Sequence, residues 1–341
     1  MRAIKFVEPY KAEYVDTAIP EITGDEVLIK VRAVGICRSD VDAFMGRHPY
    51  RIPPVITGHE FSGVIDKVGK NVRDFKIGDR VCVEPHIGCG TCLYCKEGAY
   101  NVCKTKELIG VKDWVGCFAE YVMARPAMCT KIPDEMSFEE GALLEPLAVG
   151  VHAVELADMS EGANVAVQGC GTIGMLTLGA VLTKKPKNII ISDISPVKRN
   201  LAKELGANYL VDPAADDLGK VVMDVTGNYG VDYLFVTVPV APVLQQSLTL
   251  VRKRGKLCIV ALFDKPIELD VAQIQLNERT VIGSCMYTRE DYEIALNYYT
   301  AGTLDFKKLI TKRISFDEAA SHVERLAKGE LGDEIKIIAV L

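Results

Sequence analysis

Over roughly the first 140 residues, hydrophobic and polar positions form short stretches that Gly and Pro separate. Residues 26–31 (Glu-Val-Leu-Ile-Lys-Val) and 78–83 (Gly-Asp-Arg-Val-Cys-Val) are examples. Short β-rich stretches between turn residues favour antiparallel strands in a partly open barrel. The sequence therefore predicts a β-rich domain at the N-terminal end of the chain.

The pattern changes after Glu145-Pro146, where nearly continuous apolar runs alternate with stretches that have the apolar spacing of helices. The runs are residues 164–168, 188–193, 209–212, 231–238, 256–262 and 280–284. The helical candidates are residues 175–182, 196–205 and 241–251. Continuous runs rich in Val and Ile are typical of strands buried on both faces, so six of them predict a doubly wound parallel sheet. We expect the barrel domain over residues 1–148, the parallel sheet domain over 149–285, and a return to the first domain over 286–341.

The composition excludes several classes of protein. Of the 341 residues, 49% are hydrophobic and 25% are charged, which rules out a disordered or fibrous chain. No apolar run reaches the length of about 20 residues that a membrane span needs, and the first residues lack a signal peptide. A formal charge of −6 argues against wide contact with nucleic acid phosphates. We therefore expect a cytoplasmic protein with neither nucleic acid nor membrane as its partner.

Four cysteines form the strongest local signal. Eight of the eleven cysteines lie between positions 37 and 129, and four of these are Cys89, Cys92, Cys95 and Cys103. Four thiolates at this spacing can surround one tetrahedral Zn²⁺ ion and leave it no open position, which predicts a structural zinc lobe over about residues 86–104. One alternative is a set of unrelated buried cysteines. Another is a zinc module that binds nucleic acid, which the negative charge disfavours.

A second signal is the segment Gly169-Cys170-Gly171-Thr172-Ile173-Gly174, between an expected strand and an expected helix. In this setting the first glycine permits a tight turn, the second lets a pyrophosphate approach, and the third lets the helix pack closely. Asp193 follows the next strand, where a carboxylate accepts the ribose hydroxyls and repels a 2′-phosphate. The segment predicts binding of NAD rather than NADP, although Lys198 and Arg199 are nearby cations. The alternative is a strand–helix connection that binds no ligand.

A third signal is dispersed along the chain. Cys37 lies in Gly35-Ile36-Cys37-Arg38-Ser39-Asp40, and His59-Glu60 follows Gly58. A thiolate, an imidazole and a carboxylate would bind a second Zn²⁺ and leave its fourth position open for a substrate or water. Each part alone is more often structural, but their occurrence together favours a catalytic metal site.

In this combination the chain resembles the zinc-containing medium-chain alcohol and polyol dehydrogenases. The resemblance extends over essentially the whole sequence. It is carried by the two cysteine motifs, the glycine segment and three shorter stretches: residues 58–63 (Gly-His-Glu-Phe-Ser-Gly), 78–81 (Gly-Asp-Arg-Val) and 145–148 (Glu-Pro-Leu-Ala). It implies a GroES-like catalytic domain with an inserted Rossmann-type domain, two Zn²⁺ ions per chain, NAD, and a homo-oligomer (dimer or tetramer).

The resemblance also implies roles for individual residues. Cys37, His59 and Glu60 match the catalytic zinc ligands, and Glu145 matches a carboxylate that is a ligand or contacts the zinc water in relatives. Ser39 matches the hydroxyl that takes the proton of the alcohol. The expected cofactor contacts are Arg38, which matches an arginine that meets the pyrophosphate, and Gly169, Gly171, Thr172, Ile173, Gly174, Asp193 and Lys198.

Three departures bear on the substrate. Asp42 stands where relatives often have a proton-relay histidine, Ala43 where sorbitol dehydrogenases have a tyrosine, and Met286-Tyr287 where they have an Arg-Tyr pair. We expect sorbitol to be a poor substrate and the pocket to suit a ring-bearing secondary alcohol, within a general function of hydride transfer between NAD and a polyol, cyclitol or sugar derivative. The alternative is a threonine-type dehydrogenase, although that branch usually has Asp-Pro-x-Gly at residues 145–148.

Overall fold

Residues 1–341 are described by a computed structural model, which divides into two compact units. Unit 1 comprises Met1–Glu145 and Ile310–Leu341, and unit 2 comprises Pro146–Leu309. Residues 286–309 therefore belong to unit 2, whereas the sequence pattern placed them with the first domain. Their helix α10 (Arg289–Thr300) is tied to unit 2 by a 2.9 Å hydrogen bond between His152 Nδ1 and Asp291 Oδ2.

Unit 1 is built mainly from short strands, as the alternating pattern predicts. Its strands are β1 (Arg2–Glu8), β2 (Lys11–Asp16), β3 (Val27–Gly35), β4 (Glu60–Val68), β5 (Arg80–Val83), β6 (His86–Ile87), β7 (Glu107–Leu108), β8 (Tyr121–Ala124), β9 (Cys129–Lys131), β16 (Ile310–Ser315) and β17 (Lys336–Val340). Its helices are α1 (Arg38–Phe44), α2 (Leu93–Lys96), α3 (Phe138–Ala142) and α12 (Ala319–Ala327), with 3₁₀ turns at Tyr100–Val102, Pro126–Met128 and Phe316–Glu318.

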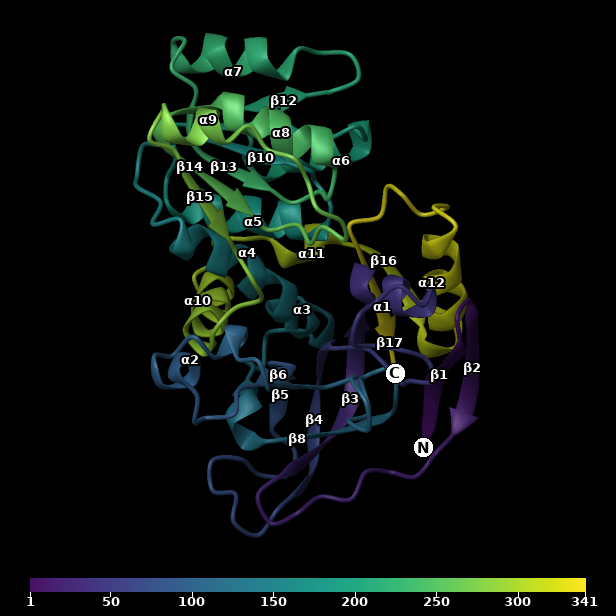
Figure 1. Ribbon diagram of the computed structural model, residues 1–341. Coiled ribbons are helices and arrows are strands. Elements are labelled where there is room, and N and C mark those ends of the chain that lie inside the picture. Colours follow the sequence, from purple (N-terminus) through teal and green to yellow (C-terminus); the bar gives the residue numbers. More distant parts are fainter. The chain divides into compact units, whose positions relative to one another are not determined.

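The main sheet of unit 1 joins the segment Ile310–Leu341 to strands from the first part of the chain. Its strand order is β16-β17-β3-β4-β5-β9, and β8 also pairs with β3. In Figure 1 the yellow strand β17 lies beside the purple strand β3. A hydrophobic core that includes Phe6, Phe61, Phe118 and Ile337 fills the interior of this unit. The C-terminal segment is thus an integral part of the unit.

Unit 2 contains one parallel sheet with helices packed against it. Its strands are β10 (Asn164–Gln168), β11 (Asn188–Ser192), β12 (Tyr209–Val211), β13 (Val231–Val236), β14 (Val251–Ile259) and β15 (Thr280–Gly283). Its helices are α5 (Thr172–Thr183), α6 (Pro196–Leu205), α7 (Leu218–Thr226), α8 (Ala241–Leu250), α9 (Val271–Gln275), α10 and α11 (Phe306–Leu309), and α4 (Leu144–Leu156) begins at the end of unit 1.

The strand order β12-β11-β10-β13-β14-β15 is that of a Rossmann-type doubly wound sheet, and every pair is parallel. The fold class expected from the sequence is therefore confirmed. In this topology the order reverses between β10 and β13, and the carboxyl ends of these strands form the place where dinucleotides bind. None of the helices is both long enough and apolar enough to cross a lipid bilayer.

Candidate metal and dinucleotide sites

Three candidate ligands for a catalytic metal meet in unit 1. Cys37 lies between β3 and α1, while His59 and Glu60 lie at the start of β4. Because β3 and β4 are antiparallel neighbours with Gly35 opposite Glu60, the two segments bring these residues together. The Cys37 sulfur, a His59 ring nitrogen and a Glu60 carboxylate oxygen all lie within 4.8 Å of one another. A thiolate, an imidazole and a carboxylate at this spacing fit a zinc ion with an open fourth position.

The space for Glu60 depends on the residue opposite it. A Cβ atom at position 35 would collide with the carboxylate of Glu60, so the glycine leaves room for this carboxylate in its present position. The absence of a side chain at Gly35 therefore provides the space that the Glu60 carboxylate occupies.

Asp40 fixes the surroundings of the first two ligands. Its Oδ2 atom accepts a 3.0 Å hydrogen bond from the backbone N–H of Cys37, and its Oδ1 atom accepts one of 3.0 Å from the hydroxyl of Thr57. Oδ1 also lies 3.6 Å from Nδ1 of His59. Burial raises the pKa of Asp40, but His59, Arg51 and the Cys37 N–H together outweigh burial and hold the pKa at about 2. An ionised Asp40 of this kind orients a ligand imidazole.

Lys336, from the last strand of the chain, reaches the same site. Its ammonium group donates to Oε2 of Glu60 and to the backbone oxygen of Ile36, the latter at 3.1 Å. The Lys336 and Glu60 side chains are both 1% exposed. Burial lowers the pKa of Lys336, but the negative charges of Glu60 and Cys37 prevail and raise it. Glu60 is thus held by a buried cation on one side and is available to a metal on the other.

The other residues predicted for this site, Ser39, Arg38 and Glu145, lie outside the group of three ligands. Ser39 is partly exposed, and its Oγ atom lies 3.5 Å from Nη1 of Arg51. Arg38 is exposed and forms a 3.1 Å ion pair with Asp42 on the next turn of α1. Glu145 is buried in the first turn of α4 and lies outside the group of three ligand atoms.

Ala43 also differs from its expected setting. It is fully buried and packs in the core beside Phe44. Its side chain faces the protein interior, so the structure gives no support to a pocket wall widened at this position.

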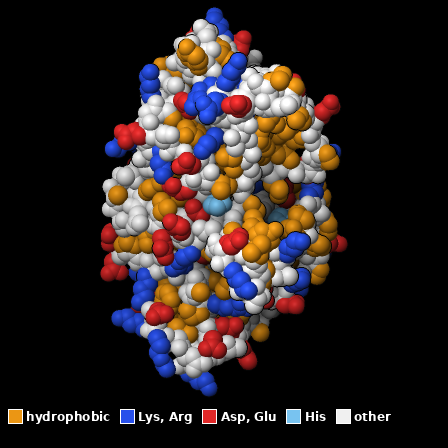
Figure 2. All heavy atoms as spheres, turned by 60° about the vertical axis from the view of Figure 1, so that its left-hand side comes forward, with side chains coloured by type: hydrophobic (Ala, Val, Ile, Leu, Met, Phe, Trp, Pro, Cys, Tyr) orange, Lys and Arg blue, Asp and Glu red, His pale blue; other side chains and the backbone are white.

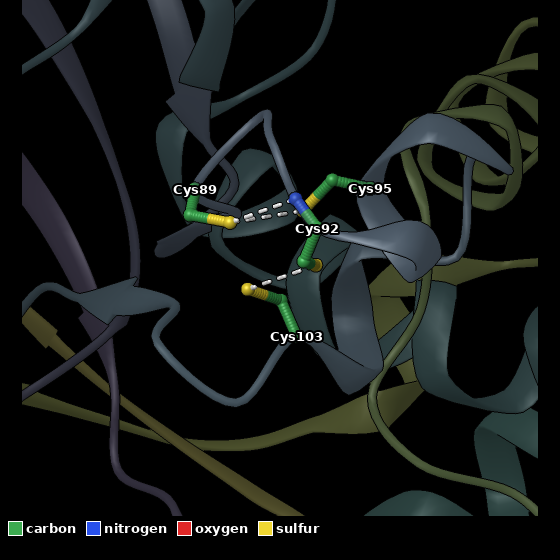
Figure 3. A group of neighbouring side chains, drawn as sticks. All are labelled: Cys89, Cys92, Cys95 and Cys103. Carbon is green, nitrogen blue, oxygen red and sulfur yellow. Dashed lines mark hydrogen bonds between the residues drawn. The ribbon is translucent and has the colours of Figure 1, made fainter.

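The second cysteine group forms a compact lobe, drawn in Figure 3. Cys89, Cys92 and Cys95 come from the loop before α2 and from α2 itself, Cys103 follows the turn at Tyr100–Val102, and the four sulfur atoms face one another. The Sγ–Sγ distances are 3.9 Å for Cys89 and Cys95 and 3.8 Å for Cys92 and Cys103. Zn–S bonds of about 2.3 Å in a tetrahedron place sulfur atoms about 3.8 Å apart. The lobe therefore has the dimensions of a closed tetrahedral zinc site.

Without a bound cation, each ionised thiol of this lobe makes it harder for its neighbours to lose their protons. Hydrogen bonds from the Thr91 side chain and from backbone N–H groups lower the pKa of Cys89 to about 5. Desolvation and the neighbouring thiols raise the pKa of Cys95 to about 12. Four thiolates so close together need a positive ion between them, because like charges at this separation disfavour ionisation.

The glycine segment of unit 2 forms the turn expected of it. Gly169 has φ +94°, a left-handed conformation that glycine adopts without strain, and Gly171 precedes the first residue of α5. A Cβ atom on Gly174 would collide with the carbonyl oxygen of Gly169, which explains the close approach of the helix to the turn. Thr172 and Ile173 are partly exposed in the first turn of α5. The segment thus combines a tight glycine turn with a helix N-terminus, the arrangement at which phosphates bind in such folds.

Asp193 lies directly after β11, at the carboxyl end of the sheet. Its carboxylate accepts hydrogen bonds from the backbone N–H of Cys170 (2.6 Å) and of Ser195 (2.8 Å). Arg199 donates to the backbone oxygen of Asp193 at 2.5 Å and forms a 3.0 Å ion pair with Asp212. Lys198 lies in the first turn of α6, where its backbone N–H donates to the Ser195 hydroxyl. Asp193 is thus fixed beside the glycine turn, and Arg199 is engaged by the Asp193 backbone oxygen and by Asp212.

Three charged residues around the catalytic group are not among the predicted site residues: Asp40, Arg51 and Lys336. Lys336 carries a recognisable signal, because it is the one charged residue in the apolar stretch Ile335–Val340 and buried lysines are almost always paired. Arg51 lies in a proline-containing loop without periodicity, and Asp40 lies in a helix turn with other polar residues, so neither has such a signal.

Comparisons with known proteins agree with this architecture. The family model of the alcohol dehydrogenase GroES-like domain matches residues 23–134, and that of zinc-binding dehydrogenases matches residues 172–301. Sorbitol dehydrogenase of Bacillus subtilis is 36% identical over 312 residues, which cover 90% of this chain and 88% of that protein. D-arabitol-phosphate dehydrogenase of Enterococcus avium is 36% identical over 330 residues, which cover 95% of this chain and 92% of that protein.

A solved structure from Sinorhizobium meliloti, described as a zinc-binding dehydrogenase bound to NADP, superposes with a TM-score of 0.93 at 31% identity. The superposition covers 100% of this chain and 99% of the other. Together the matches show an alcohol-oxidising enzyme that uses zinc and a nicotinamide cofactor. The chain belongs to the zinc-containing medium-chain alcohol and polyol dehydrogenases.

Proposed function

We propose that this protein oxidises a secondary alcohol of a polyol, cyclitol or sugar derivative with NAD, at a zinc ion held by Cys37, His59 and Glu60. The observation that carries the proposal is that three different types of ligand atom lie within 4.8 Å of one another. Ser39, a partly exposed residue, follows Cys37 by two positions. A site with three protein ligands leaves one position for the substrate, whereas the four-cysteine lobe leaves none.

When bound, Zn²⁺ supplies a Lewis acid that lowers the pKa of an alcohol, and the nicotinamide accepts the hydride that leaves the carbinol carbon. The chain's own residues have three tasks. Ser39 would relay the hydroxyl proton, releasing its own proton toward solvent as it takes that of the alcohol. Asp40 would keep the His59 ring in its ligand orientation, and Lys336 balances the charge of Glu60. Glu145 lies close enough to Lys336 to raise its pKa, which supports a place near the site without direct ligation.

A second Zn²⁺ is proposed in the lobe of Cys89, Cys92, Cys95 and Cys103. All four sulfur atoms lie within 4.8 Å of one another, so a bound ion has no vacant position for a substrate. Its proposed role is to hold the loop around α2 in one conformation.

The preference for NAD is proposed on the geometry around Asp193. A carboxylate beside the glycine turn accepts ribose hydroxyls and repels a 2′-phosphate. Arg199, the cation nearest to it in sequence after Lys198, is held by Asp212 and is not free to bind that phosphate. The placement of Asp193 and the ion pair of Arg199 with Asp212 both support a preference for NAD, although one similar structure is bound to NADP.

Two further proposals concern the state of the protein. Strand β15 is the last strand of its sheet, and exposed Leu262, Val271 and Leu276 lie in the segment that connects β14 with β15, which supports a homo-oligomer formed through this edge. All eleven cysteines are free, and five of them are candidate zinc ligands: four in the zinc lobe and Cys37 in the catalytic group. A reducing compartment such as the cytoplasm suits them.

A panel of alcohols assayed with NAD tests the proposed reaction through the absorbance of NADH. We expect activity with at least one ring-bearing secondary alcohol, and lower kcat/KM with sorbitol and xylitol. Activity on threonine above that on every polyol and cyclitol would favour the threonine-type alternative. If no alcohol reduces NAD in protein that contains zinc, the proposed reaction is wrong.

A further inference from the structure

Arg51 is a buried cation beside the candidate catalytic group. It is only 6% exposed, yet no carboxylate of the chain forms an ion pair with it. Its Nε atom is buried without a hydrogen-bond partner. Burying a charge without a partner is costly, so such a group is unusual unless a ligand completes it.

The two contacts that the Arg51 guanidinium does make are weak. One is to Oγ of Ser39 at 3.5 Å, at the limit of a hydrogen bond. The other brings Nη1 to within 3.2 Å of Nε2 of His48. Neither partner carries a negative charge that would balance the guanidinium.

The contact with His48 also fails as a hydrogen bond. Nδ1 of His48 accepts the backbone N–H groups of Tyr50 (3.1 Å) and Arg51 (3.0 Å). Burial and the neighbouring Arg51 lower the pKa of His48 to about 4, so the ring is neutral near pH 7. A neutral ring whose Nδ1 is an acceptor carries its proton on Nε2, and two N–H donors then face each other. Most donors of Arg51 are therefore unused.

The charge of Arg51 helps to lower the pKa of Asp40, but the two side chains form no ion pair. Both carboxylate oxygens of Asp40 are already occupied, by the Cys37 N–H on one side and by Thr57 and His59 on the other. Lys336, the other buried cation of this region, is matched by Glu60. Arg51 is the cation that remains without a counter-ion.

We propose that Arg51 binds an anionic group of the substrate, a phosphate or a carboxylate attached near the carbon that is oxidised. The proposal rests on the function proposed above and narrows it to anionic polyols or sugar derivatives. The guanidinium contacts Ser39, the residue proposed to relay the substrate proton. An anion bound by Arg51 would therefore belong to the same small molecule as the reacting hydroxyl. A planar fork of N–H donors matches both anions with paired, charge-assisted hydrogen bonds.

The cofactor's own phosphates are a less suitable partner. The glycine turn and the N-terminus of α5 in unit 2 already supply a phosphate site, with Gly171 at the first turn. Arg51 belongs to unit 1 and contacts the residue that handles the substrate proton. A role toward the cofactor predicts a different kinetic effect, which the experiment below separates.

The experiment compares purified wild-type enzyme with Arg51→Gln, Arg51→Lys and the control Arg47→Gln. Arg47 is exposed and lies in the same loop, so its substitution makes the same change in charge away from the site. Steady-state kcat/KM is measured with sorbitol 6-phosphate, gluconate and threonine, and with sorbitol as the neutral counterpart. Calorimetric titration without NAD gives the Kd of the best anionic compound, and titration with NAD gives the Kd of the cofactor.

We expect the wild-type enzyme to favour one anionic compound over sorbitol by at least about tenfold, the effect of one charge-assisted hydrogen bond pair. Arg51→Gln should lower kcat/KM for that compound by about 10- to 100-fold, and its effect on sorbitol should be less than threefold. Arg51→Lys should restore part of the loss, and Arg47→Gln should have no effect. The compound that responds identifies the anion as phosphate or carboxylate.

Three results would overturn the inference. These are an equal loss for neutral and anionic compounds, a weaker Kd for NAD in Arg51→Gln, and a neutral polyol as the best substrate of the wild-type enzyme. If no compound is oxidised but the anion still binds in an Arg51-dependent manner, the proposed reaction fails while the assignment of Arg51 holds.

Discussion

The ammonium group of Lys336 contacts the carboxylate of Glu60, although 276 residues separate them in the chain. Both side chains are almost completely buried, and Glu60 is also one of three candidate zinc ligands. We therefore expect the same carboxylate to be shared between a lysine and a metal ion. The stability of unit 1 should then depend on the metal.

Replacing Lys336 with Met should destabilise the metal-free protein by about 3–5 kcal/mol, because the buried carboxylate of Glu60 loses its partner. The loss should be smaller in zinc-loaded protein, since a bound cation compensates the same charge. Urea unfolding of both forms measures the difference. Lys328→Met, which breaks an exposed ion pair with Glu324 in the same unit, serves as the control and should have little effect. Equal losses with and without zinc would show that Glu60 does not serve the metal.

The two metal sites should respond differently to the loss of one ligand. Cys37→Ser should abolish turnover and leave the fold intact, because the open site lies on a scaffold formed by β3 and β4. Cys95→Ser should mainly lower the thermal midpoint, because the lobe around α2 has little buried apolar surface of its own. Elemental analysis should give two Zn²⁺ ions for the wild type and one for each variant. Fewer than one zinc per unchelated wild-type chain would contradict both assignments.

Cofactor choice should depend on Asp193 and on the ion pair behind it. Asp193→Ser should raise the ratio of kcat/KM for NADP to that for NAD by about 10- to 100-fold, because a repelled 2′-phosphate becomes tolerated. Asp212→Asn should raise the ratio as well, since it releases Arg199 toward the phosphate. The wild-type ratio is the reference. Equal efficiency with both cofactors in the wild type would refute the role of Asp193.

Gly35→Ala should remove the catalytic zinc and spare the structural one. The new methyl group would occupy the space of the Glu60 carboxylate, so elemental analysis should fall from two ions per chain to one. Gly332→Ala is the matched control in the same unit, because a Cβ at that position meets no atom within 4 Å and the backbone is not left-handed. Two zinc ions in Gly35→Ala would show that Glu60 can move without loss of the metal.

Local patterns in the sequence predicted much of unit 2. The predicted strand 164–168 coincides with β10, and the predicted helix 196–205 coincides with α6, which Ser195 caps and which has Pro196 at its first position and Gly206 after its last. The strand predicted at 256–262 begins earlier, at Val251, and ends at Ile259. The polar residues 252–254 conceal its start, because β14 pairs with β13 through a register shift there.

Some features of the sites are encoded in short segments, and others depend on contacts between residues far apart in the sequence. The four-cysteine lobe and the glycine turn are each encoded within a short segment, so spacing alone suggests them. The contacts of Lys336 with Glu60 and of Arg51 with Ser39 arise from strand pairing and from the path of a loop. No periodicity in the sequence carries such information, and the missing counter-ion of Arg51 becomes visible only when the neighbours of Asp40 are known.

The position of β17 in the main sheet has a consequence for biosynthesis. The ribosome completes the contiguous segment Pro146–Leu309 before it makes β17, so unit 2 can fold as an independent unit while the rest of the chain is still being made. Unit 1 must wait for β17, because this strand pairs with one edge of β3 and supplies Lys336. A nascent chain that stops before β17 would therefore present the dinucleotide unit together with an open sheet edge, a substrate for chaperones or proteases.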